Sequence, residues 1–82
     1  MIGENSDFVF RNDVNVVQQI REAIGLDRKE FAELMGVDYD TVWGWETGRR
    51  QPKFTVQQVK VIWHYAKRLN IDLSDIPDNL IN

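Results

Sequence analysis

Basic side chains suited to binding phosphate are gathered in two short runs of the sequence. Arg28 and Lys29 form the first run, and the second run consists of Arg49, Arg50 and Lys53. Guanidinium and ammonium groups neutralise nucleic-acid phosphates and fix the register of a protein on a duplex without reading its sequence. We therefore expect the second run to contact DNA phosphates, with an ordinary solvated loop as the alternative.

Other residue types that carry chemistry are scarce. The chain has no cysteine and a single histidine, His64, which has no evident partner in the sequence. It also lacks a glycine-rich phosphate loop and a pair of carboxylates at a suggestive spacing. The sequence therefore predicts no enzyme activity, no metal site and no cofactor.

The charge balance limits how nucleic acid can be bound. The 82 residues carry a formal net charge of −3, and acidic residues are concentrated towards both ends. An acidic chain is poorly suited to bind DNA non-specifically, because counterion release needs many cationic side chains facing phosphate. We therefore expect a local basic patch rather than a broad basic surface.

The chain reads as one folded unit without a linker or an internal repeat. We interpret residues 1–12 as an N-terminal arm and residues 13–82 as the domain. Neither a secretory signal nor an apolar stretch of ~20 residues is recognisable, so the expected location is the cytoplasm, in association with the nucleoid. The apolar segment Phe8-Val9-Phe10 is either an arm over the core or a strand that pairs across a dimer.

Capping residues and glycines predict where the first two helices begin and end. These helices position the first basic run. Asn12-Asp13 is predicted to cap a first helix, which ends at Gly25. Asp27 and Glu30 have the spacing of a capping box, which predicts a second, very short helix ending at Gly36.

A third helix follows at once. Asp38 is predicted to cap it, and it runs to about Glu46 before Thr47-Gly48 stops it. The second helix is too short to be stable alone, so it must pack against the third through a sharp corner at Gly36. The sequence therefore predicts a helix-turn-helix from about Asp27 to Trp45.

A longer fourth helix is expected over residues 55–70. Its apolar residues recur at helical spacing and predict one buried face, formed by Val56, Val59, Ile62, Trp63, Ala66 and Leu69. Val61 and Tyr65 lie on another side, either as ordinary surface or as a subunit contact made with tail residues Leu73, Ile76 or Leu80. Ser74 is a candidate cap for one last turn before Pro77.

The third helix must turn one face outward. At about 100 degrees per residue, Val42 and Trp45 fall together on the inward side. The opposite side carries Tyr39, Asp40, Trp43 and Thr47. Gly44 lies at the edge of this outer face, where its missing side chain would let the helix backbone come close to a phosphate or sugar.

The string from Leu26 to Asp38, continued from Thr41 to Pro52, resembles the lambda-repressor-like Xre/Cro family. Its most specific part is Trp45-Glu46-x-Gly48-x-x-x-Pro52 after an Ala32-x-x-x-Gly36-Val37 helix and turn. The resemblance covers about residues 14–76. It implies an all-α, lambda-repressor-like bundle of four to five short helices, a homodimer on a roughly palindromic operator in double-stranded DNA, and transcriptional regulation, more often repression than activation.

Two residues take their expected roles from this resemblance. Glu46 is expected to pair with Arg21 of the first helix, because a carboxylate facing the core needs a partner to offset its desolvation. Arg28 stands where the family often carries glutamine for a phosphate or base contact near a helix N-terminus. Arginine also reaches phosphate, but the family's base preference does not carry over.

The outer face of the third helix lacks the residues that usually discriminate bases, because it offers no Arg, Lys, Asn or Gln for bidentate contacts. Asp40 could accept a hydrogen bond from a cytosine amino group, and Trp43 or the Thr47 methyl group could meet a thymine methyl group. Tyr39 could donate to phosphate. The predicted DNA-binding residues are Arg28, Lys29, Asp38, Tyr39, Asp40, Thr41, Trp43, Gly44, Thr47, Arg49, Arg50 and Lys53.

The outer aromatic residues also suggest a function of a different class. Tyr39 and Trp43 would suit an interface with a protein, because aromatic side chains are frequent anchors of such interfaces. The chain would then be a protein-binding module or an antitoxin-like partner protein on the same scaffold. The spacing of the helices and the basic loop favour DNA binding.

Overall fold

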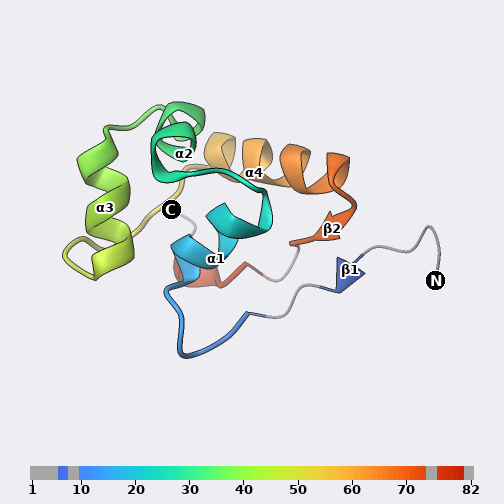
Figure 1. The fold of residues 1–82 in the computed structure, drawn as a ribbon, viewed down its shortest axis with the longest axis horizontal. Helices are drawn as coiled ribbons and strands as arrows, with labels where there is room; N and C mark the ends of the chain where they lie inside the picture. Colours follow the sequence, from blue (N-terminus) through green and yellow to red (C-terminus); the bar gives the residue numbers. More distant parts are fainter. Residues whose placement is uncertain (1–5, 8–9, 74–75, 81–82) are drawn as a thin grey trace.

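Four α-helices make up most of the part of the chain that the computed structural model describes, which is residues 6–7, 10–73 and 76–80. They are α1 (Val16–Ala23), α2 (Arg28–Met35), α3 (Tyr39–Thr47) and α4 (Val56–Arg68). Two-residue strands β1 (Ser6–Asp7) and β2 (Ile71–Asp72) and a 3-10 turn, η1 (Asp78–Leu80), accompany them. Figure 1 shows α3 at one end of the long axis and the β1–β2 pair towards the other. The expected all-α bundle is confirmed.

The first helix begins later than the sequence suggested, and Asn12-Asp13 does not cap it. Asn15 is the cap: its Oδ1 accepts hydrogen bonds from the second and third N–H groups after it, at 2.9 and 3.1 Å. Its Nδ2 donates to the carbonyl oxygen of Trp45 at 2.9 Å, which fastens α1 to α3. Asp13 pairs instead with Arg11 at 2.9 Å on the surface. Asn15 is thus fixed by a tertiary contact that helical periodicity does not reveal.

The second helix and the corner after it follow the prediction. Asp27 Oδ1 accepts from the N–H of Glu30 at 2.8 Å, and Glu30 Oε1 accepts from the N–H of Asp27 at 2.9 Å, which closes the capping box. Gly36 ends α2 at φ 71°, a left-handed conformation that favours glycine. Asp38 holds the cap position of α3, but within the described part of the chain its side chain makes no capping hydrogen bond. The predicted side-chain cap is therefore wrong.

The buried side of α4 is rotated from the predicted one. Three residues of the expected face are buried, namely Val59, Ile62 and Ala66. The other three are exposed, namely Val56, Trp63 and Leu69. Val61 and Tyr65 pack against the core instead, and the core also contains the tail residues Leu73, Ile76 and Leu80. The tail residues that one alternative assigned to a subunit contact are buried within the chain itself, because the tail folds back and gives α4 a neighbour on that side.

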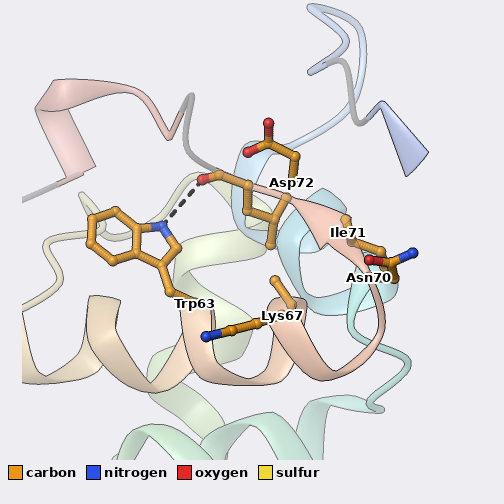
Figure 2. A pocket seen from close by; sticks show the side chains of 7 residues that line it. Trp63, Lys67, Asn70, Ile71 and Asp72 are labelled. Carbon is orange, nitrogen blue, oxygen red and sulfur yellow. Dashed lines mark hydrogen bonds between the residues drawn. The ribbon is translucent and has the colours of Figure 1, made fainter. Parts of the chain in front are cut away.

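Two carbonyl oxygens of the tail accept hydrogen bonds from other segments of the described chain. The indole Nε1 of Trp63 donates to the carbonyl oxygen of Leu73 at 3.2 Å (Figure 2). The backbone N–H of Phe54 donates to the carbonyl oxygen of Leu80. These bonds place the apolar tail residues against α4 and against the loop that precedes it.

Phe54 is a core residue that the sequence analysis missed. It is fully buried, and its ring meets the ring of Trp45 edge to face with centroids 5.3 Å apart. It follows directly on a polar loop, which hides it from periodicity. Its place before the Thr55 cap and five residues before the buried Val59 is that of a hydrophobic staple, so a local signal does exist.

The start of the described chain lies beside the segment that follows α4, because β1 pairs in parallel with β2. Phe10 is half-buried and packs against the core, whereas Phe8 and Val9 lie outside the described residues. The last turn, η1, comes after Pro77 rather than before it, and Ser74 also lies outside the described residues. Among the helices described, none has the length and apolarity to cross a membrane.

Candidate nucleic-acid interface

The outer face of α3 is open to solvent. Its exposed residues are Tyr39, Asp40, Trp43 and Thr47. The two aromatic side chains stand out, since Tyr39 is 48% exposed and Trp43 is 41% exposed. On the opposite side Val42 and Trp45 are buried, and α3 contacts α1 and α2 there. The helix therefore divides into the inner and outer sides that its sequence spacing predicts.

Glu46, at the inner edge of α3, is the centre of a buried ion-pair cluster. Only 1% of its side chain is exposed. Arg21 binds it with two hydrogen bonds, from Nε to Oε2 at 2.7 Å and from Nη2 to Oε1 at 3.1 Å. Arg21 Nη1 donates to the carbonyl oxygen of Leu26 at 3.0 Å. The structure thus brings the expected structural pair together, and the bidentate geometry offsets the desolvation of both charges.

Arg28 joins the same carboxylate from the other side. Its Nε donates to Glu46 Oε1 at 2.9 Å, and its guanidinium carbon lies 4.9 Å from the ring centroid of Trp43. The hydrogen bond to Glu46 raises the pKa of Arg28 above its ordinary value, so the group stays cationic. Arg28 therefore connects a buried carboxylate to an exposed aromatic ring, and its side chain remains 32% exposed. Neither neighbour of Arg28 is indicated by the spacing of residues in the sequence.

Arg50 follows α3 and folds back across the opposite edge of its outer face. Its Nη1 donates to Thr41 Oγ1 at 2.9 Å. Its Cγ and Cδ lie over Gly44, where an added Cβ would stand 2.7 and 2.6 Å from them. Gly44 is therefore covered by an arginine side chain. The prediction that its backbone is open to a phosphate or sugar is wrong.

The start of the loop after α3 is fixed by backbone hydrogen bonds. The N–H groups of Arg49 and Arg50 both donate to the carbonyl oxygen of Gly44, at 3.0 and 3.1 Å. Gly48 makes this turn possible at φ 81°, in the left-handed region. The side chains around it leave a hollow of about 570 Å³, lined by Asp40, Trp43, Gly44, Arg49 and Arg50.

The remaining predicted residues lie outside these two clusters. Lys29 and Lys53 are exposed, as is Asp38 at the start of α3. Thr47 Oγ1 donates to the carbonyl oxygen of Trp43 at 2.8 Å, so its hydroxyl group is engaged within the helix. In the described ranges, no three His, Cys, Asp or Glu side chains gather into a group that could hold a metal ion.

The helices α2 and α3 and the turn between them match a known family. Residues 17–56, from α1 to the first residue of α4, match the family model described as Helix-turn-helix. These residues form a helix-turn-helix of the lambda-repressor-like Xre/Cro family. Comparison with curated proteins and with solved structures gave no match. The family consists of DNA-binding regulatory domains and is not an enzyme family.

Membership of the helix-turn-helix family gives the two central helices their roles. In a helix-turn-helix the second helix lies in the major groove of DNA, and the first crosses the backbone. Here α3 is the second helix and α2 the first. Both arginine clusters contact α3, so both lie at the second helix of the motif.

Proposed function

We propose that this chain is a regulator of transcription that recognises a specific sequence of double-stranded DNA through α3. The observation that carries the proposal is the open outer face of α3, with Tyr39 48% and Trp43 41% exposed and the guanidinium groups of Arg28 and Arg50 beside it. A helix with such a face fits the major groove, where base edges can be read. Asp40 and Trp43 then face bases.

Phosphate contacts come from the segments on either side of α3. The start of α2 supplies Arg28 and Lys29, and the loop after α3 supplies Arg49 and Lys53. The Tyr39 hydroxyl group adds a donor. Because the net charge of the whole chain is −3, attraction to DNA is confined to this surface and must fall as salt rises.

In this proposal the regulator acts as a homodimer. We favour repression over activation as its effect on transcription. An occupied operator blocks a polymerase without any further protein contact, so binding alone suffices for repression. A two-fold dimer sets two copies of α3 about 34 Å apart, one turn of DNA, on a palindromic operator. It also doubles the number of phosphate contacts, which an acidic chain needs for affinity.

The dimer contact that we propose is the exposed side of α4. Val56 and Trp63 are exposed, and a spacing of seven residues puts them on one face of the helix. Trp63, Lys67 and Ile71 line the same hollow of about 690 Å³ (Figure 2). A two-fold contact is self-complementary, so the same residues of two copies meet. Trp63→Ala is expected to weaken dimerisation roughly ten-fold or more in sedimentation equilibrium, and an unchanged constant would assign the contact elsewhere.

Binding to a pool of random duplexes tests the DNA-binding proposal itself. The affinity should fall steeply between about 50 and 200 mM salt, and selection followed by sequencing should enrich a palindromic motif. A correctly folded protein without salt-dependent affinity for DNA would contradict the proposal. The aromatic face of α3 would then be assigned to a protein partner.

A further inference from the structure

A guanidinium group lies on α3 although the outer face of this helix contains no Arg, Lys, Asn or Gln. It belongs to Arg50, which comes three residues after Thr47 ends the helix. The loop turns so tightly that the Arg50 N–H donates to the carbonyl oxygen of Gly44 at 3.1 Å. The side chain of Arg50 therefore starts beside the middle of the helix.

Two residues of α3 determine where this side chain lies. Gly44 leaves room for it, because a Cβ at this position would stand 2.6 Å from Arg50 Cδ. Thr41 anchors its end, because the Thr41 hydroxyl oxygen accepts from Nη1 at 2.9 Å. The Thr41 bond involves one terminal nitrogen, and a guanidinium carries five N–H donors, so donors remain for a ligand.

A hydrogen-bond acceptor shares a hollow with this donor. Asp40 and Arg50 line the same hollow of about 570 Å³ on the outer side of α3. In the major groove a guanine presents two acceptors, O6 and N7, and its cytosine partner presents an amino donor. Arginine binds the first pattern with two hydrogen bonds, and a carboxylate accepts from the second. The hollow thus combines the two groups that a G·C pair requires.

We infer that Arg50 is a specificity-determining residue that reads a guanine in the major groove, with Asp40 facing the cytosine of that pair. The inference rests on the proposed DNA-binding function. It gives Arg50 a different role from its neighbour Arg49, which holds phosphate. The helix therefore obtains its base-reading arginine from the following loop.

Selection of duplexes by the full chain and by the variants Arg50→Ala and Arg49→Ala tests this division. The wild type should enrich a guanine at one position of each half-site. Arg50→Ala should lose roughly ten-fold or more of the discrimination at that position while leaving the others unchanged. Arg49→Ala is the matched control: it should weaken all duplexes alike and lower the slope of log affinity against log salt by about one for each half-site, hence by about two for the dimer.

Gly44→Ala provides a second variant that keeps every residue that could touch DNA. Alanine is favoured in a helix interior, so the circular dichroism spectrum should be unchanged, but the new methyl group displaces Arg50. The guanine preference of Gly44→Ala should fall as it does in Arg50→Ala. A variant that combines the two substitutions should lose no more of this preference than either substitution alone. A uniform loss across all duplexes in Arg50→Ala would overturn the inference and leave DNA binding intact. Failure of the wild type to bind any duplex would overturn the proposed function and the inference with it.

Discussion

Two arginines flank the outer face of α3, and they are held in different surroundings. Arg28 lies at the edge formed by Trp43 and Glu46, and Arg50 lies at the edge formed by Thr41 and Gly44. Each is fixed by a hydrogen bond of 2.9 Å. The acceptor of Arg28 is a buried carboxylate, whereas the acceptor of Arg50 is a hydroxyl group in an exposed bond.

The Arg28–Glu46 and Arg50–Thr41 hydrogen bonds therefore differ in their contribution to stability although their lengths are equal. A hydrogen bond to a charge is stronger where water is excluded, and an unpaired charge costs most there. Exposed polar contacts contribute little to stability because water replaces them readily. The Arg28 side should thus be coupled to the stability of the fold, and the Arg50 side to recognition alone.

Removal of Glu46 should have the largest effect on stability. Glu46→Ala leaves Arg21, whose side chain is 10% exposed, without its carboxylate, and also releases Arg28. We expect the free energy of unfolding in urea to fall by about 3–5 kcal/mol, a large part of the stability of a small domain.

Glu22→Ala is the matched control for this variant. Glu22 is exposed on the surface and lies 3.9 Å from the same Arg21 side chain. Its removal should cost less than about 0.5 kcal/mol. Equal losses in the two variants would show that burial of Glu46 is not what makes its ion pair matter.

The contact between Arg28 and Trp43 should have an intermediate effect. Arg28→Ala alone should cost about 1 kcal/mol, because Glu46 keeps its two hydrogen bonds to Arg21. A double-mutant cycle with Trp43→Ala should give a coupling of about 0.5–1 kcal/mol, the size of a cation–π contact at an exposed site. Urea unfolding of the four proteins measures it. A coupling of zero would mean that the two groups are adjacent without stabilising each other.

Features fixed by neighbouring residues were predictable from the sequence. Asp27, Glu30 and Gly36 determine α2 and its end through bonds and torsions within a few residues of each other. The inner and outer sides of α3 follow from the helical repeat, with Val42 and Trp45 buried. Family resemblance supplied the pairing of Arg21 with Glu46, which lies 25 positions away.

Features that depend on the fold of the tail, or on where a distant side chain lies, were not predictable from the sequence. The buried side of α4 depends on Leu73, Ile76 and Leu80, whose return to the core has no signal in the spacing of α4. Local spacing alone predicts that Gly44 opens the helix towards DNA, because the sequence does not show that Arg50 fills the space. In both cases a distant segment occupies a surface that local patterns leave free.

Removal of the Thr41 hydroxyl group should have the smallest effect on stability. Thr41→Val keeps the β-branched shape and has a similar helix propensity, and the lost bond to Arg50 is exposed. The free energy of unfolding in urea should therefore change by no more than about 0.5 kcal/mol, while the guanine preference weakens because Arg50 loses its anchor. A loss of stability above about 1.5 kcal/mol would show that Arg50 also supports the fold. The two edges of α3 would then be energetically alike, and the separation of stability from recognition would fail.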